Sequence, residues 1–227
     1  VERLKTTVPW KQLKMLSIPM KANQVLGSTG KFGKALSFDG RNAMAAVNQV
    51  PFNSDRGTIE AWVFLPLMQK KESAIIWFIQ SADGSPWRFH QLTVPANSRK
   101  VQYLTYNGAP GNAVSQITSK EITSEDWVHI AVTYDLAAKK MELFVNGESQ
   151  GTAPYTIPCG GRKGDLNIGA RIHNTGNTYQ FIGGCQMQLD DLRISDTVRP
   201  KAIPEKALEK DANTLLLLGF DGADYMK

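Results

Sequence analysis

Cysteine, long apolar runs and clustered charge are all scarce in this chain of 227 residues. The longest aliphatic run is the four leucines at 215–218, far short of the roughly 18 apolar residues that a membrane helix needs, so we predict no membrane span. Lys and Arg (26) outnumber Asp and Glu (21), but the basic residues are scattered and no nucleic-acid-binding motif is visible. We therefore predict no nucleic-acid partner, although a net charge of +5 favours anionic polymers.

The only two cysteines are Cys159 and Cys185, which lie 26 residues apart. They lack the Cys-x-x-Cys spacing of metal or redox sites, which leaves either two free thiols or one disulfide. We predict a disulfide between Cys159 and Cys185, which would place the chain in an oxidising compartment.

Catalytic and zinc-binding patterns are also missing. The three histidines have no His-Glu-x-x-His-like spacing, and His129 follows Trp127 closely in an apolar strand pattern, which favours a packed or hydrogen-bonded imidazole. Glu60 stands between Ile59 and Ala61, but glycoside hydrolysis needs two carboxylates and that segment offers no second one. We predict that the protein is not an enzyme.

Short segments rich in β-branched and aromatic residues, bounded by Gly, Pro, Asn or Asp, make up most of the chain. They predict about eleven strands, at 35–39, 43–47, 57–65, 74–80, 87–94, 100–106, 127–134, 140–146, 166–170, 186–194 and 214–218. This spacing is typical of an all-β sandwich or barrel. One short helix is expected within Pro204 to Asp211, across the outside, because proline fits the first turn of a helix.

The segment WVHIAVTYDLAAKKMELFVNGE (127–148) shows the pattern most clearly. Its apolar residues alternate with polar ones, which predicts two paired strands with one buried face each. Asn146-Gly147 favours a tight two-residue turn into a third strand. We also expect Trp62 and Trp127 to be buried, because both lie in strands between core positions.

Six segments occur in an order that is similar to laminin-G-like, concanavalin A-like jelly-roll domains. They are GKFGKALSFDG (30–40), GTIEAWVFLP (57–66), DWVHIAVTYD (126–135), KKMELFVNGE (139–148), LNIGAR (166–171) and LDDLRISD (189–196). The resemblance covers about residues 30–196 and implies a two-sheet antiparallel jelly-roll sandwich. It does not identify a ligand, because such a fold hosts many functions.

The carboxylate motif of jelly-roll glucanases is absent, and RFHQL (88–92) inverts the Gln-x-His order of similar polysaccharide lyases. The resemblance therefore implies a non-enzymatic carbohydrate-binding or adhesion module that is secreted, periplasmic or at the cell surface. Its partner would be a glycan or polysaccharide, and the net positive charge favours an anionic one. Two alternatives stay open, namely a protein-interaction or structural module appended to a larger enzyme, and a hydrolase with dispersed catalytic residues.

Sugar sites combine an aromatic platform with convergent polar groups. Residues of these kinds at expected loops or strand ends are the candidates, namely Trp87, Arg88, Tyr103, Tyr106, Asn107, Asn177 and Tyr179.

Calcium is the ion that the sequence favours. Asp39 precedes Gly40 at the end of the first core strand, and Asp190 lies in a late strand that neighbours the first in similar jelly rolls. Two such carboxylates would suit a structural Ca²⁺ ion, which takes oxygen ligands. The alternative is that Asp39 caps a turn while Asp190 or Asp191 pairs with a base such as Arg193.

The sequence LSFDG (36–40) is echoed by LLGFDG near the end of the chain (217–222). Either the closing strand, at about 214–220, returns to the same sandwich, or a second similar domain begins there. We predict the returning strand and one domain over residues 1–227, because four successive leucines suit a strand buried on both faces.

Overall fold

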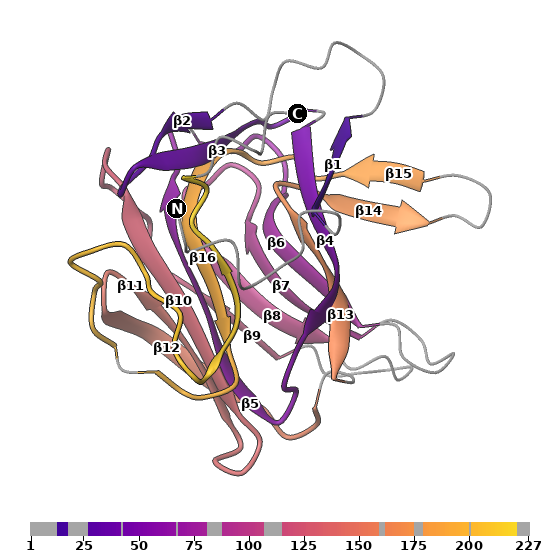
Figure 1. The fold of residues 1–227 in the computed structure, drawn as a ribbon, viewed down its shortest axis with the longest axis vertical. Helices are drawn as coiled ribbons and strands as arrows, with labels where there is room; N and C mark the ends of the chain where they lie inside the picture. The colour runs from indigo at the N-terminus through magenta and orange to yellow at the C-terminus, as the bar shows by residue number, and fades with distance from the viewer. Residues whose placement is uncertain are drawn as a thin grey trace.

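The structure is a computed structural model, in which residues 13–17, 27–41, 43–66, 68–80, 88–106, 115–158, 162–174, 179–199 and 201–221 are described. Over these ranges the protein is all-β, with two large antiparallel sheets packed face to face (Figure 1). The predicted all-β, two-sheet antiparallel jelly-roll sandwich is confirmed. No helix in the described residues is long and apolar enough to cross a membrane.

One sheet has seven strands in the order β1-β4-β13-β6-β7-β8-β9. Their bounds are β1 Leu13–Ser17, β4 Ala43–Pro51, β13 Lys163–Ile168, β6 Ser73–Gln80, β7 Arg88–Val94, β8 Gln102–Tyr106 and β9 Ser115–Thr118.

The other large sheet has eight strands, ordered β12-β11-β10-β5-β16-β3-β2 with β17 paired to β16. Their bounds are β12 Glu148–Pro154, β11 Lys140–Val145, β10 Val128–Asp135, β5 Arg56–Phe64, β16 Gln186–Ser195, β3 Lys34–Asp39, β2 Gly27–Thr29 and β17 Thr214–Leu218. A separate hairpin, β14 (Arg171–Asn174) and β15 (Tyr179–Ile182), projects from the sandwich at the upper right of Figure 1.

The core lies between the two sheets and follows the two-residue period of each strand. In β10 this face carries the side chains of Val128, Ile130, Val132 and Tyr134, all of them buried. The turn that leads from β11 into β12 contains Asn146 (φ 47°) and Gly147, both with positive φ as a type I′ turn requires. The predicted hairpin and the third strand that follows it are therefore confirmed.

The closing strand returns to the same sandwich, as predicted. One edge of β16 is divided between two partners, because Gln186–Leu189 pairs with β3 and Leu192–Ser195 pairs with β17. Beyond β17, a carboxylate oxygen of Asp221 accepts a hydrogen bond from the backbone N–H of Lys34 at 2.9 Å. The two echoed segments thus lie beside the same strand.

The helix expected within Pro204–Asp211 is not formed, since the described residues of this segment have no helical backbone. The segment that joins β16 to β17, described at residues 196–199 and 201–213, is instead a non-helical strap across the outside of the eight-stranded sheet (Figure 1). Contacts with the sheet explain why no helix forms. The Leu208 side chain is buried, and the Leu208 backbone N–H donates to the Asp191 carboxylate at 2.7 Å. A tertiary contact thus replaces an intrahelical hydrogen bond.

The predicted disulfide is not formed, because Cys185 is a free thiol with no exposed surface. It belongs to the core between the sheets, where burial raises the pKa of the thiol. Cys159 lies outside the described residues. Cys185 therefore acts here as a small apolar core residue.

Candidate functional site

An aromatic pair lies on the outer face of the seven-stranded sheet. Phe89 in β7 is directly opposite Tyr106 in β8, and their rings stack with centroids 5.2 Å apart. Both side chains are half-buried. They face away from the core because their neighbours His90 and Leu92 point inward.

Amide side chains occupy the next position across the same face. The register aligns Asn167 of β13 with Trp77 of β6, Trp77 with Gln91 of β7, and Gln91 with Leu104 of β8. Asn167 and Gln91 are buried although they point away from the sandwich core. Phe89, Gln91 and Asn167 were not among the predicted site residues, although the period-two alternation of RFHQLTV (88–94) places Phe89 and Gln91 on one face.

An ion pair between Arg171 and Glu72, both partly or largely exposed, borders these residues. The amide of Gln91 donates to Glu72 at 3.4 Å, and Glu72 also contacts the guanidinium of Arg171 at 3.1 Å. Arg171 begins the projecting hairpin β14–β15, so the hairpin is tied to this edge of the face. Aromatic surface, amides and an ion pair are thus brought together from four strands and a loop.

The structure separates the predicted sugar-binding residues. Tyr106 is half-buried on the outer face, whereas Tyr103 is 1% exposed and its hydroxyl contacts His90 Nδ1 at 2.7 Å in the core. The prediction that Tyr103 binds sugar is therefore wrong, because the two-residue period of β8 points its side chain toward the opposite sheet. Arg88 begins β7 and Tyr179 begins β15, and only their backbones are described. The remaining candidates, Trp87, Asn107 and Asn177, lie outside the described residues.

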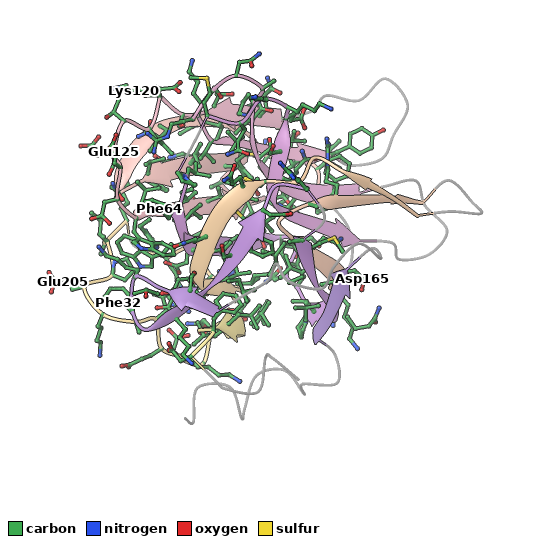
Figure 2. The ribbon with its side chains drawn as sticks, turned by 90° about the horizontal axis from the view of Figure 1, so that it is seen from above. Phe32, Phe64, Lys120, Glu125, Asp165 and Glu205 are labelled. Carbon is green, nitrogen blue, oxygen red and sulfur yellow. The ribbon has the colours of Figure 1, made fainter. Side chains whose placement is uncertain are left out.

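A charged network is buried on the outer face of the other sheet. Figure 2 shows Phe64, which lies on this face, on the opposite side of the sandwich from Asp165 of the seven-stranded sheet. Glu60 accepts two hydrogen bonds from Arg193, at 2.8 and 2.7 Å, and contacts His129 Nε2 at 3.2 Å. Burial alone would raise the pKa of Glu60, but the His129 hydrogen bond and the Arg193 charge outweigh it and keep the pKa below its usual value.

A β-bulge in β16 makes this network possible. Asp190 is opposite Trp62 and Arg193 is opposite Glu60, so β16 has one extra residue between these pairs. The bulge contains Asp191 with a φ of 49° and puts Asp190 and Arg193 on the same face. Arg199 from the strap lies 3.9 Å from Glu60 and pairs with Asp211 at 2.7 Å. The network therefore anchors the strap to the sheet.

The two tryptophans that we expected to be buried lie on this outer face. Trp62 is 4% exposed, which confirms its burial, and its ring is covered by Phe32 (5.8 Å) and by the Lys31 ammonium (4.9 Å). Trp127 is only half-buried and packs on Phe64 with centroids 6.0 Å apart, so the prediction for Trp127 is wrong. Its position just before β10 leaves one side of the ring toward solvent.

The predicted calcium ligands do not meet. The strands β3 and β16 are neighbours as expected, but Asp39 is opposite Gln186, which is four residues from Asp190 and so about 13 Å away along the strand. Asp39 instead caps a turn, accepting hydrogen bonds from the backbone N–H groups of Arg41 and Ala43. Within the described ranges, no three His, Cys, Asp or Glu side chains are grouped to hold a metal ion. The pairing of Asp39 with Asp190 at one ion is therefore wrong, and a structural calcium ion remains an untested prediction.

Asp190 has a role of its own. Its carboxylate accepts hydrogen bonds from the backbone N–H groups of Phe32, at 2.9 Å, and Asp191, at 2.7 Å. Burial, together with the negative charges of Asp191 and Asp221, raises the pKa of Asp190 to about 7 although these hydrogen bonds lower it. Asp190 thus holds the loop before β3 against the sheet, and Arg193 is not its partner.

Residues 39–202 match a laminin-G-type family model described as the concanavalin A-like lectin/glucanases superfamily. This match covers more than two thirds of the chain. The chain belongs to this family. Among curated proteins no match was found.

Three solved structures of the same fold come from different kinds of protein. A candidate carbohydrate-binding protein from Bacteroides ovatus aligns with a TM-score of 0.58 and 17% identity, over 86% of this chain and 53% of its own. The mouse laminin α1 domains LG4-5 align with a TM-score of 0.54 and 10% identity, over 87% of this chain and 50% of their own. Domain 4 of an extracellular arabinanase from Geobacillus stearothermophilus, solved with arabinotriose, aligns with a TM-score of 0.55 and 13% identity, over 83% of each chain. The chain spans about half the length of the first two.

Proposed function

We propose that the protein is a carbohydrate-binding module whose site is the outer face of the seven-stranded sheet. The observation that carries the proposal is the half-buried stacked pair of Phe89 and Tyr106 on this face. An aromatic ring packs against the apolar face of a sugar, and a half-buried ring still has a side that a sugar can reach. The family membership and the neighbours that bind sugars support the same proposal.

Binding without catalysis is part of this proposal. The buried carboxylate Glu60 is engaged by two cationic side chains and covered by the strap, and the described residues of the proposed sugar face include one carboxylate beside Gln91, Glu72, which pairs with Arg171. A glycosidase needs a pair of free carboxylates flanking the bond that it cleaves. A secreted, periplasmic or cell-surface setting, where glycans are abundant, fits such a module.

A glycan array, run with and without calcium, tests the proposal, followed by titration of the best glycan against three variants. Tyr106→Ala removes the ring and is expected to weaken binding about tenfold or more, since each tenfold step corresponds to about 1.4 kcal/mol. Tyr106→Phe keeps the ring and is expected to bind within a few-fold of the unmodified protein. Phe64→Ala, on the opposite outer face, is the control and should bind unchanged.

A second candidate function is a protein-interaction module within a larger protein. The half-exposed pair Phe64 and Trp127 on the eight-stranded sheet favours it, because exposed aromatic pairs are common in protein interfaces. A blank glycan array, together with partner binding that Phe64→Ala abolishes and Tyr106→Ala spares, would replace the first proposal by this one. Turnover of a polysaccharide that is lost on changing one carboxylate would instead identify an enzyme.

A further inference from the structure

A cleft of about 570 Å³ opens at the end of the sandwich where β3 ends and where β6 and β16 begin. Three segments form its walls, namely residues 39–41, residues 68–71 with Ser73, and residues 183–184 with Gln186. None of the residues of the proposed sugar face lines it. The cleft is therefore a separate site.

Hydrogen bonds hold the three walls in place. The buried side chain of Gln69 donates to the carbonyl of Gln186 and accepts from its N–H, both at 3.1 Å, so it joins two walls directly. The N–H of Ala74 donates to the carbonyl of Gly183 at 2.8 Å, which ties the same two segments again. Asp39 fixes the third wall by capping its turn. The cleft is formed before any ligand arrives.

Positive charge dominates the lining. Arg41, Lys70 and Lys71 are exposed, and none of the ion pairs found among the described residues involves them. The one carboxylate in the lining is Asp39, an oxygen of which is used by the turn. Glu72, which follows Lys71, pairs with Arg171 outside the lining. The lining thus contains three cationic side chains and one carboxylate, that of Asp39, so it carries a net positive charge.

The size and the other walls indicate what kind of anion fits. A volume of about 570 Å³ exceeds that of a lone sulfate and lies within the range of sites for ligands of several rings. Gly40 and Gly183 present backbone without side chains, and Met68, 56% exposed, adds an apolar edge. A sugar ring could pack against Met68 while its anionic substituent meets the cations.

We propose that this cleft binds a sulfated or carboxylated unit of an acidic polysaccharide. Arg41 would contact the anionic group through its planar guanidinium, and Lys70 and Lys71 would act as point charges. This extends the proposed function by naming a class of glycan, but the site differs from the one on the sheet face. The two sites can therefore be tested separately.

The test is calorimetric titration with dextran sulfate, polygalacturonate, neutral dextran and inorganic sulfate. We expect both charged polymers to bind, with an affinity that falls as salt is added, while neutral dextran does not bind in the cleft. The triple variant Arg41→Ala, Lys70→Ala, Lys71→Ala should lose at least tenfold in affinity for the charged polymers. The single variant Lys71→Glu should show a loss in the same direction.

A matched control removes the same charge elsewhere, through Lys120→Ala, Arg162→Ala and Lys163→Ala, three exposed residues outside the lining. It should bind within about twofold of the unmodified protein once the melting temperatures of all variants agree. Equal losses in both triple variants would mean nonspecific surface charge and would overturn the proposal. Inorganic sulfate that binds as tightly as a polymer unit would overturn the polysaccharide assignment.

Tyr106→Ala separates this site from the sheet face. The variant should bind the charged polymers normally even if it loses neutral glycans. If Tyr106→Ala abolishes binding of the charged polymers and the cleft variant does not, the acidic glycan binds on the sheet face and the cleft proposal fails. If neutral glycans never bind but the cleft variant alone loses dextran sulfate, the cleft stands and the sheet-face proposal fails.

Discussion

Two buried titratable side chains, Asp190 and His90, are held in the sandwich for structural reasons. Asp190 fixes a loop to the outer face of one sheet, while His90 lies in the core among Phe52, Tyr134 and Tyr155. Burial disfavours the charged form of both, so the pKa of the acid is raised and that of the base is lowered. Each should leave its own signature in the pH dependence of stability.

Asp190 is expected to lower stability as the pH rises. The pKa of Asp190 is about 7 in the folded protein against an ordinary value of 3.8, so between these pH values the folded state binds a proton that the unfolded chain has released. The stabilising contribution of the protonated form is present below about pH 4 and is lost as the pH rises through 7. Asp190→Asn should flatten the melting temperature between pH 4.5 and 7.5, while exposed Glu205→Gln should leave the profile as it is. An Asp190→Asn profile that parallels the unmodified one would contradict this reading.

His90 is expected to act in the opposite direction. Burial lowers the pKa of His90 from 6.5 to about 3. Between pH 3 and 6.5 the imidazole is therefore protonated in the unfolded chain but neutral in the folded protein. Its contribution to stability is complete above pH 6.5 and is lost as the pH falls toward 3. NMR titration should find the His90 imidazole neutral throughout pH 5 to 8, and a midpoint near 6.5 would show that the ring reaches solvent.

At the scale of elements, the bulge in β16 and the strap depend on each other. The bulge turns Arg193 onto the outer face, where it neutralises Glu60, and the strap adds Arg199 to the same carboxylate. Arg199 also donates to the Ser195 hydroxyl at 2.6 Å and binds both oxygens of Asp211. One arginine thus joins the two ends of the strap.

Replacing Arg199 is expected to loosen the strap without unfolding the sandwich. Arg199→Ala removes the bidentate contact with Asp211 and leaves Glu60 with fewer cations, so residues 196–213 should detach more often. We expect tryptic cleavage after Lys201, Lys206 or Lys210 to be several-fold faster, with Arg199→Lys intermediate and Lys120→Ala unchanged. Equal cleavage rates in all four proteins would show that apolar contacts such as Leu208 hold the strap instead.

For the molecule as a whole, the close approach of the two sheets depends on a glycine. Gly169 follows β13 with a φ of 86°, and a Cβ atom at this position would lie 2.3 Å from the ring of Phe38 in β3. The aromatic ring cannot move without displacing its core neighbours, because protein interiors are closely packed. Gly169 thus sets the distance between the sheets at this point.

Gly169→Ala is expected to lower the free energy of unfolding by about 2 kcal/mol or more, through overpacking added to the strain of a positive φ. Gly151→Ala is the matched control, because Gly151 also has a positive φ, 133°, but its added Cβ would meet only Ile117 at an ordinary 3.5 Å. Urea denaturation of both variants separates the two effects. Equal losses would assign the cost to backbone strain alone.

The strands and their buried faces were predictable because alternation is a local signal that each segment carries by itself. All eleven predicted strands are present, and short or polar strands such as β2 and β9 were missed because they contain too few apolar residues to show a period. The candidate site was predicted only in part. Tyr106 was found, but Phe89 was not, since it becomes a partner only through the pairing of β7 with β8.

The sequence by itself determined the fold class, the hairpin with its Asn146-Gly147 turn, and the return of the last strand, because these follow from periodicity, turn chemistry and the need to bury apolar faces. Only the tertiary structure decided which polar residues meet. The register keeps Asp39 away from Asp190, a one-residue bulge brings Arg193 to Glu60, and contacts with the sheet hold the strap out of a helix. Such pairings depend on residues far apart in the chain, so no local pattern encodes them.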